Sequence, residues 1–272
     1  MATGMPSRSK DSIGLAVYSL WYRELVRFGR QKSRLLGALA TPLLFWLVIG
    51  GGFGRSFRPE NKLEGMTYLE YFFPGVVVLV VLFTSIYSTI SVIDDRKEGF
   101  LQGVLVSPAP RGAVVMAKLF GGTTLAMFEA VLVLLIAPWV GMTMGWASVA
   151  QGLILLFLIA FGLTGLGLMI AWAMDSTAGF HAIMNLLLMP MWIVSGAVFP
   201  VQEAHPVLRL LMIINPLTYG VDGFRQALYG SSTGSDRGLW PMWLCLVVSV
   251  VFATATTWGS IRVARRKSES GR

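Results

Sequence analysis

Long apolar runs, separated by short polar segments, dominate the chain. Crossing a bilayer as a helix takes roughly 20 consecutive apolar residues. Five stretches free of charged residues approach or exceed this length, and turn-forming residues near the middle of the longest one divide it into two spans. The pattern predicts six membrane-spanning helices, at residues 35–54, 70–93, 114–138, 148–174, 177–199 and 239–261.

The composition agrees with a multi-spanning membrane protein. Of the 272 residues, 55% are hydrophobic and 13% are charged, whereas about 25% are charged in a typical soluble domain. The apolar runs are continuous and do not alternate, which favours helices over strands. We therefore predict an all-α protein with a single transmembrane domain over residues 1–272. The one cysteine, Cys245, cannot form a disulfide within the chain.

Lysine and arginine are distributed unequally between the two sides that six spans define. Sixteen of the 22 lie in segments on the side of both termini, and six lie opposite. Because cytoplasmic loops carry the excess of Lys and Arg, both termini are predicted to be cytoplasmic. The cytoplasmic segments are then 1–34, 94–113 and 262–272, and the long outer segment is 200–238. The basic residues flank spans and form no single groove, so we expect no nucleic-acid partner.

The segment before the first span has the pattern of a helix lying in the membrane surface. One face repeats apolar residues, among them Trp21 and Phe28, and beside it runs a stripe of Arg23, Arg27, Arg30 and Arg34. Helices of this kind bind the headgroup layer, so membrane lipid is an expected partner. Glu24 interrupts the apolar face, which predicts a polar protein contact. The pattern leaves open whether the segment only anchors the chain or also transmits force.

A charged and amphipathic insert, residues 94–111, separates the second and third spans. After its charged start, Phe100, Leu101, Val104 and Leu105 repeat on one side of a short helix. Pro108 ends that helix, because proline cannot continue the hydrogen-bond ladder. An apolar face left in water marks an interaction site. We therefore favour docking into a groove of a partner over a solvated loop that only reverses the chain.

The outer segment, 200–238, is too polar to cross the membrane but contains an apolar stretch at 207–214. It predicts short helices that dip back into the outer leaflet. Asp222 and Arg225 stand at i, i+3 spacing on one of them, so they can pair and hold the turn together. Contact with a substrate is the other interpretation of these two residues.

Among the polar residues inside predicted spans, where such side chains are costly unless they have partners, three are candidates for a path through the membrane. Glu129 lies near the middle of the third span. It either faces a path through the membrane or makes a contact between helices. His181 and Asn185 are four residues apart on the fifth span and share a face. They either contact a substrate or form hydrogen bonds between helices.

The sequence lacks the motifs of nucleotide binding and metal catalysis. It has no G-x-x-x-x-G-K-[ST] phosphate loop and no H-E-x-x-H motif, and it contains only two histidines and one cysteine. We therefore expect no catalytic centre, no metal site and no cofactor bound by this chain.

Three stretches, in the right order along the chain, resemble a known family. The string D-R-K-E-G-x-L-x-x-x-L-V-S-P-x-x-R-(x)6-K, from Asp95 to Lys118, looks like the cytoplasmic loop of type-2 ATP-binding-cassette (ABC) exporter permeases. These are the membrane subunits of exporters of the daunorubicin and nodulation-factor kind. Residues 23–25 and 42–45 are similar to the family's interfacial helix and opening span, and residues 215–225 to its stretch before the last span.

The resemblance implies a permease domain that works as a dimer, with a homodimer expected, in the bacterial inner membrane. A separate ABC ATPase, which holds ATP and Mg, would dock on the cytoplasmic loop. The residues implied in this coupling are Asp95, Arg96, Lys97, Glu98, Gly99, Phe100, Leu101, Val104, Leu105, Pro108 and Arg111, with Trp21, Arg23, Glu24, Arg27, Phe28 and Arg30 of the interfacial helix. Those implied in closing the outer end are Asn215, Pro216, Tyr219, Asp222 and Arg225.

A secondary transporter or channel driven by an ion gradient is the alternative from another class. It predicts several charges within the membrane, or paired broken helices from inverted repeats. The sequence contains one mid-membrane carboxylate, Glu129, and no clear repeat. We therefore favour an ATP-driven exporter of an amphipathic drug, a lipid or a lipid-linked glycan.

Overall fold

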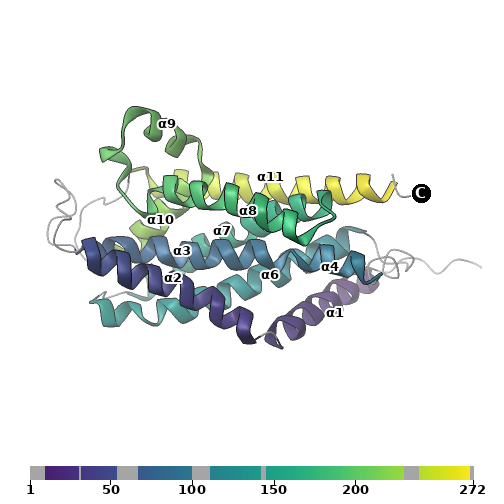
Figure 1. Cartoon of the computed structure of the whole chain (residues 1–272). Coiled ribbons are helices and arrows are strands. Elements are labelled where there is room, and N and C mark those ends of the chain that lie inside the picture. The colour runs from purple at the N-terminus through teal and green to yellow at the C-terminus, as the bar shows by residue number, and fades with distance from the viewer. Residues whose placement is uncertain are drawn as a thin grey trace, which may run out of the picture.

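The computed structural model describes residues 10–30, 32–53, 67–99, 111–141, 145–229 and 239–269. Every regular element in these ranges is helical, which confirms the all-α prediction. The longer helices lie along an elongated bundle (Figure 1). The α-helices are α1 (Lys10–Gly29), α2 (Lys32–Phe53), α3 (Tyr68–Ser88), α4 (Ser91–Lys97), α6 (Arg111–Leu134), α7 (Trp146–Ala173), α8 (Thr177–Trp192), α9 (Pro206–Ile214), α10 (Pro216–Tyr229) and α11 (Met242–Glu269). The short elements η1 (Ala137–Val140), η2 (Ile193–Ala197) and η3 (Val201–Glu203) connect them.

Five helical segments are long and apolar enough to cross a membrane. They are Tyr68–Lys97, Gly112–Trp139, Trp146–Ala173, Thr177–Ala197 and Met242–Lys267, and they correspond to the second to sixth predicted spans. The predicted first span, 35–54, falls on α2, whose described apolar part, Leu39–Gly52, is shorter. The crossing of the membrane by α2 therefore stays a prediction.

The predicted re-entrant segment contains α9, which stands away from the bundle in Figure 1. Most of its apolar side chains are exposed, and Val207 and Ile214 are the most exposed of them. Insertion of this helix into the outer leaflet also stays a prediction.

The helix α3 forms the centre of the bundle. A capping box begins it: Thr67 Oγ1 accepts a hydrogen bond from the Glu70 N–H, and Glu70 Oε2 accepts one from the Thr67 N–H. Most of the following side chains are buried, including the large rings of Phe72 and Phe73. A helix that is apolar on all sides is covered by other elements. Here α2, α6 and α7 pack around α3, so its position determines theirs.

Glycines bring α7 and α11 close together. A Cβ atom at Gly165 would lie 2.7 Å from Thr256 Oγ1 and 3.0 Å from Thr256 Cβ, and one at Gly162 would lie 2.5 Å from Phe252 Cδ1. Small residues allow such close approach, and packing is a main source of helix association in membranes. The spacing of α7 and α11 therefore depends on these glycines.

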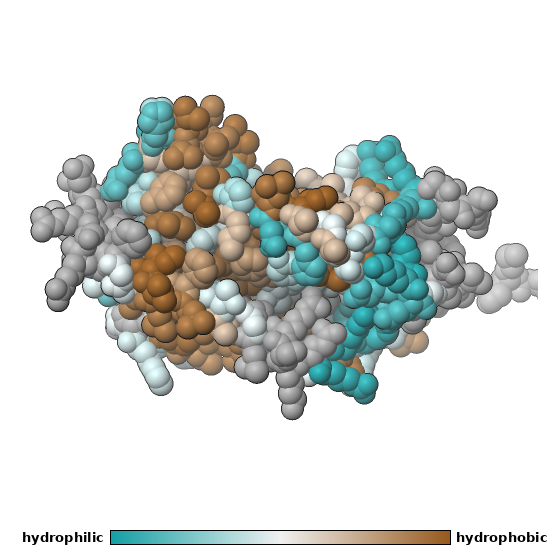
Figure 2. Space-filling model, viewed as in Figure 1, coloured by the Kyte–Doolittle hydropathy of each residue, from teal (hydrophilic) through white to brown (hydrophobic). Residues whose placement is uncertain are grey.

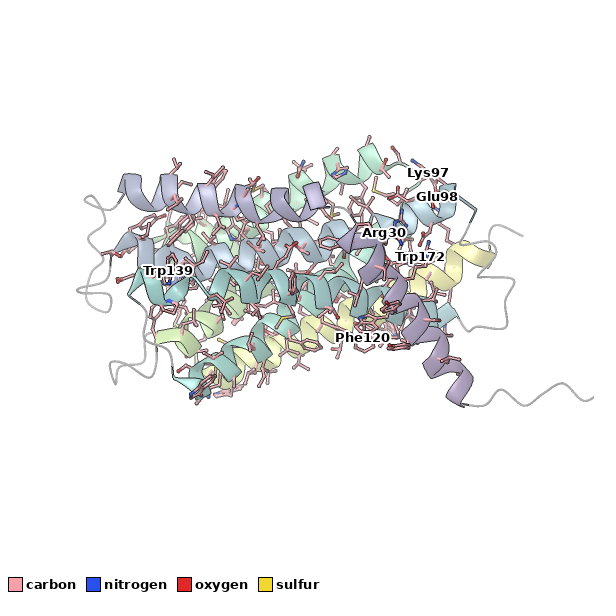
Figure 3. The ribbon with its side chains drawn as sticks, turned by 90° about the horizontal axis from the view of Figure 1, so that it is seen from below. Arg30, Lys97, Glu98, Phe120, Trp139 and Trp172 are labelled. Carbon is pink, nitrogen blue, oxygen red and sulfur yellow. The ribbon has the colours of Figure 1, made fainter. Side chains whose placement is uncertain are left out.

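Hydrophilic residues gather at one end of the molecule. Figure 2 shows them where α4, the second half of α1 and the end of α11 lie, whereas apolar residues cover much of the bundle beside them. Arg30, Lys97 and Glu98 lie at this end, and Trp139 lies at the opposite end (Figure 3). The described parts of the segments that the charge asymmetry assigns to the cytoplasm lie toward this polar end.

We predict that Gly165→Ala lowers the thermal unfolding midpoint of the protein purified in neutral detergent. The new Cβ would collide with the rigid Cβ of Thr256, and overpacking of this kind costs about 1–3 kcal/mol. Gly51→Ala is the matched control, because a Cβ at Gly51 meets no atom within 4 Å. An unchanged midpoint for Gly165→Ala would contradict the close packing of α7 and α11.

Candidate functional site

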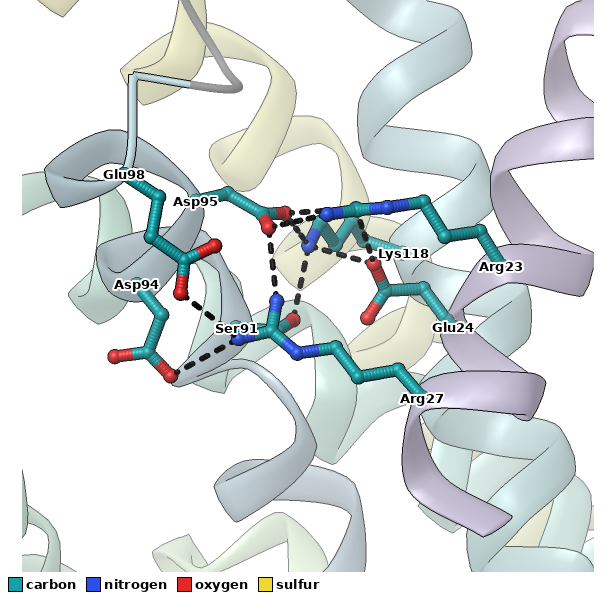
Figure 4. Close-up of polar contacts among 8 residues, drawn as sticks. All are labelled: Arg23, Glu24, Arg27, Ser91, Asp94, Asp95, Glu98 and Lys118. Carbon is teal, nitrogen blue, oxygen red and sulfur yellow. Dashed lines mark hydrogen bonds and ion pairs between the residues drawn. The ribbon is translucent and has the colours of Figure 1, made fainter. Parts of the chain in front are cut away.

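A cluster of charged side chains joins three helices at the polar end (Figure 4). Its centre is Asp95 of α4, whose exposed fraction is 0%. Arg23 Nη2 donates to Asp95 Oδ1 over 2.9 Å, and Arg27 Nη1 donates to the same oxygen over 2.8 Å. Lys118 of α6 donates to the other oxygen, Oδ2. One buried carboxylate thus binds cations from α1 and from α6.

Lys118 holds the other side of this cluster together. Its Nζ also donates to Glu24 Oε1 over 2.8 Å and to Ser91 Oγ over 2.9 Å. Glu24 and Lys118 are both buried. The polar protein contact predicted for Glu24 therefore exists, and its partner belongs to the same chain. We call the set Arg23, Glu24, Arg27, Ser91, Asp95 and Lys118 the α1–α4–α6 charge cluster.

The helix α1, predicted to lie in the membrane interface, packs on α6 where a glycine leaves room for it. A Cβ at Gly121 of α6 would lie 3.0 Å from Glu24 Cβ, so the two helices touch there. Trp21 Nε1 donates to Thr124 Oγ1 over 3.2 Å, and Phe28 is buried. Of the predicted arginine stripe, Arg23 and Arg27 point into the charge cluster, while Arg30 is exposed.

A second cluster holds the opposite side of α4. Arg96 Nη1 donates to Asp175 Oδ1 over 2.8 Å and to the Met174 carbonyl over 2.9 Å. Lys267 Nζ of α11 donates to the same Asp175 oxygen over 2.7 Å. Arg96 also lies over the ring of Trp172, 5.6 Å from its centroid. Neighbouring residues of α4 therefore bind α1 and α6 on one side, and the α7–α8 turn and α11 on the other.

The predicted coupling residues divide into an internal and an external group. Asp95 and Arg96 bond within the chain, whereas Lys97 and Glu98 are exposed, and Glu98 lies 3.8 Å from Arg27 at the edge of the charge cluster. Gly99 has a φ of +74°, a left-handed conformation that favours glycine. Phe100, Leu101, Val104, Leu105 and Pro108 lie outside the described residues, as does the side chain of Arg111 at the start of α6. Their role in ATPase docking stays a prediction.

Of the predicted pathway residues, His181 lines an apolar pocket of about 520 Å³, and Glu129 and Asn185 each form a hydrogen bond with a residue of its lining. The pocket lies among α2, α3 and α8, with the end of α1 at one side, and its lining includes Phe28, Pro42, Phe83, Thr84, Tyr87 and His181. The rings of His181 and Tyr87 are 5.1 Å apart, and Tyr87 Oη donates to Asn185 Oδ1 over 2.7 Å. Behind the wall, the Thr84 hydroxyl donates to Glu129 Oε2.

Thr84 and Tyr87 were missed by the sequence reasoning. They are polar residues one turn apart in the apolar run of α3, and that spacing was the available signal. It is a weak one, because hydroxyl groups in membrane helices commonly bond to their own backbone, as Thr164 does to the Ala160 carbonyl.

The outer segment connects α10 to the ends of two other helices. Asp222 accepts the backbone N–H of Leu239 and of Trp240, which precede α11, and burial raises the pKa of its carboxyl. Arg225 donates instead to the Gly196 carbonyl over 2.9 Å and lies 4.2 Å from the centroid of the Tyr71 ring. Asp222 and Arg225 therefore bind different partners, and no ion pair within 4.0 Å joins these two described residues.

The remaining predicted outer residues begin and brace α10. Asn215 Oδ1 accepts the Leu217 N–H, and its Nδ2 donates to the Met191 carbonyl over 2.6 Å. Pro216 occupies the first position of α10. Tyr219 Oη donates to the Ile213 carbonyl, and its ring lies 4.6 Å from that of Trp240. We interpret these contacts as structural, because they are hydrogen bonds to backbone groups at helix ends or ring packing between α10 and the residues before α11.

Comparison with known proteins gives one consistent result. The sequence profile described as ABC-2 type transporter matches residues 16–229. The chain is 27% identical to ycf38 of Cyanophora paradoxa over 80% of its own length and 75% of that protein. It is 22% identical to Nodulation protein J of Rhizobium leguminosarum bv. viciae, over 89% and 93% of the two chains. It is 25% identical to the inner membrane transport permease YadH of Escherichia coli (strain K12), over 92% and 96%.

We predict that Asp95→Asn strongly lowers the unfolding midpoint of the protein purified in neutral detergent. The substitution leaves Arg23, Arg27 and Lys118 together without the central anion, and removing one partner of a buried ion pair costs about 3–5 kcal/mol. Asp94→Asn is the matched control: Asp94 is the adjacent residue, with a side chain 36% exposed and 3.6 Å from Arg27. Its loss should cost below about 1 kcal/mol. Equal decreases in the unfolding midpoint for the two substitutions would show that Asp95 is not the centre of the α1–α4–α6 charge cluster.

The contact between Asp175 and Lys267 has a defined pH dependence. The hydrogen bond from Lys267 lowers the pKa of the Asp175 carboxyl. A lowered pKa means that the stabilisation is present above the unfolded-state pKa, about 3.9, and is lost as the pH falls through the folded-state value. The midpoint difference between the protein and its Asp175→Asn variant should therefore be constant from about pH 5 to 8. A difference that changes between pH 6 and 8 would refute this assignment.

Proposed function

The chain belongs to the ABC-2 type transporter family, and we propose that two copies of it form the export path of a transporter driven by a separate ABC ATPase. A permease role and a multi-pass location in the membrane follow from the family and from the five apolar helices. The proposal adds that the chain forms a dimer, that an ABC ATPase is its partner, that transport is outward and that ATP hydrolysis is coupled to movement of this chain.

One observation carries the coupling proposal: at two places in the chain, consecutive residues belong to the charge cluster and to the lining of the pocket. On α1, Arg27 binds Asp95, and the next residue, Phe28, lines the pocket. At the junction of α3 and α4, Ile90 lines the pocket, and the next residue, Ser91, binds Lys118. A displacement of α4 therefore moves both the cluster and the pocket wall.

The ATPase would act on α4 through residues 100–110. These residues directly follow α4 in the sequence and precede α6, and their apolar pattern predicts docking into a groove. A movement applied there reaches α1 and α6 through Asp95, and α11 and the α7–α8 turn through Arg96. ATP and Mg would be held by the ATPase, because this chain has no phosphate loop.

The second copy would cover the side of the bundle that contains α8. Only 22% of the apolar window of α8 is buried within the chain, against 78% for the segment that contains α3. The pocket also reaches this side, since Thr41 and His181 in its lining are exposed. Two copies facing each other here would enclose the two pockets between them.

The proposed location is the bacterial inner membrane, with both termini in the cytoplasm. The similarity to YadH supports the membrane, and the excess of Lys and Arg on one side supports the orientation. The exported class is an amphipathic drug, a lipid or a lipid-linked glycan, because the pocket is apolar with few polar groups.

We predict that Leu101→Asp abolishes co-purification of a cassette ATPase encoded beside this chain. The substitution places a charge on the apolar face of the predicted docking helix, where burial against a partner would desolvate it. Gln102→Asp is the matched control, since it adds the same charge to the neighbouring position outside that face. Membrane levels of both variants should equal those of the unchanged protein.

The proposal fails if the Leu101→Asp variant retains the ATPase and its activity. It also fails if the purified chain, reconstituted alone, moves substrates across liposomes under an ion gradient. Loss of the ATPase from both variants would show that added charge, and not the apolar face, determines docking.

A further inference from the structure

We infer that the pocket among α2, α3 and α8 binds amphipathic molecules whose polar end is a protonated amine. This inference rests on the proposed function, because it names the class of substrate that the export path would take. Its basis is the hydrogen-bonding state of the pocket wall and the carboxyl group behind it.

The pocket has the size and the surface of a small-molecule site. Its volume, about 520 Å³, lies within the range of about 300–1,000 Å³ found for ligand pockets. Phe28, Pro42, Phe83 and Ile90 supply an apolar lining that would hold a hydrocarbon or aromatic body. The exposed side chain of His181 shows that the pocket reaches the surface of the chain.

The hydroxyl groups of the wall present acceptors to a ligand. Thr84 donates its single hydroxyl proton to Glu129 Oε2, and Tyr87 donates its own to Asn185 Oδ1. A hydroxyl that has donated its proton offers only lone pairs to any further partner. A ligand that reaches these oxygens must therefore bring hydrogen-bond donors, and an ammonium group brings up to three.

Glu129 supplies the charge that selects an ammonium over other donors. Its exposed fraction is 0%, and it contacts the wall through Thr84. A cation held at Thr84 would lie directly in front of this carboxyl, whereas an anionic ligand would be repelled. The ligand N–H, the Thr84 hydroxyl and the Glu129 carboxyl would then form a chain of charge-assisted hydrogen bonds.

The test compares three ligands that share one apolar body: 4-phenylbutylamine, 4-phenylbutanol and 4-phenylbutanoate. Each is titrated calorimetrically into the purified full-length chain in neutral detergent, without the ATPase. We expect the amine to bind about tenfold more tightly than the alcohol, and the carboxylate to bind more weakly than the alcohol. Equal affinities for the amine and the alcohol would overturn the inference.

Two variants assign the preference to the proposed residues. Glu129→Gln keeps the size and the Thr84 contact but removes the charge, so the amine should lose its advantage while the alcohol binds unchanged. Thr84→Val removes the acceptor at constant shape and should weaken the amine more than the alcohol. Glu203→Gln is the matched control, because Glu203 is exposed in η3, and it should keep the full preference. A Glu129→Gln variant that still prefers the amine would refute the role of Glu129.

The binding experiment and the test of ATPase docking can give opposite results, so the failure of one proposal can be told from the failure of the other. A preference for the amine combined with a failure to bind the ATPase would support the pocket and remove the exporter proposal. The reverse result, ATPase binding without a preference for the amine, would leave the exporter proposal standing and remove the substrate class.

Discussion

The buried carboxylate of Asp95 is the constraint on which the polar end of the molecule depends. It binds cations from α1 and α6 at once, and Lys118 closes the set through Glu24 and Ser91. A buried ion pair adds little net stability compared with apolar packing, but breaking it is costly. Its effect is therefore to define one arrangement of α1, α4 and α6. In a membrane, where apolar side chains gain little by leaving lipid, such directional contacts decide how helices meet.

The same arrangement connects the polar end with the interior. Consecutive residues on α1, and again at the α3–α4 junction, belong to the charge cluster and to the pocket wall. The central helix α3 contributes Thr84 and Tyr87 to that wall, and its path continues into α4 after a turn at Thr89 and Ile90. At the opposite end, Arg225 and Tyr71 both donate to the Gly196 carbonyl, where η2 ends the helical segment Thr177–Ala197. The helix bundle that contains the pocket is therefore held at one end by the charge cluster and at the other end by the hydrogen bonds to the Gly196 carbonyl.

Much of the fold could be predicted from the sequence, and so could part of the site. Apolar runs have a length set by the bilayer, which is why five of six predicted spans coincide with helices long enough to cross it. A polar protein partner was expected for Glu24, and the structure shows that Lys118 of the same chain bonds to it. The sequence could not show which of Asp94 and Asp95 is buried, because the two residues have the same side chain and are adjacent in the chain. One turns toward α1 and α6 and is buried, and the other is partly exposed.

The sequence by itself determined the helical class and the absence of a phosphate loop, because these depend on local composition and on the thickness of a bilayer. The tertiary structure alone decided which charges pair, and that Thr84 and Tyr87 line one pocket with His181 while they bond to Glu129 and Asn185. Such groupings involve residues up to about a hundred positions apart, as Glu24 and Lys118 show with a separation of 94. They follow from the packing of whole helices, which no local pattern records.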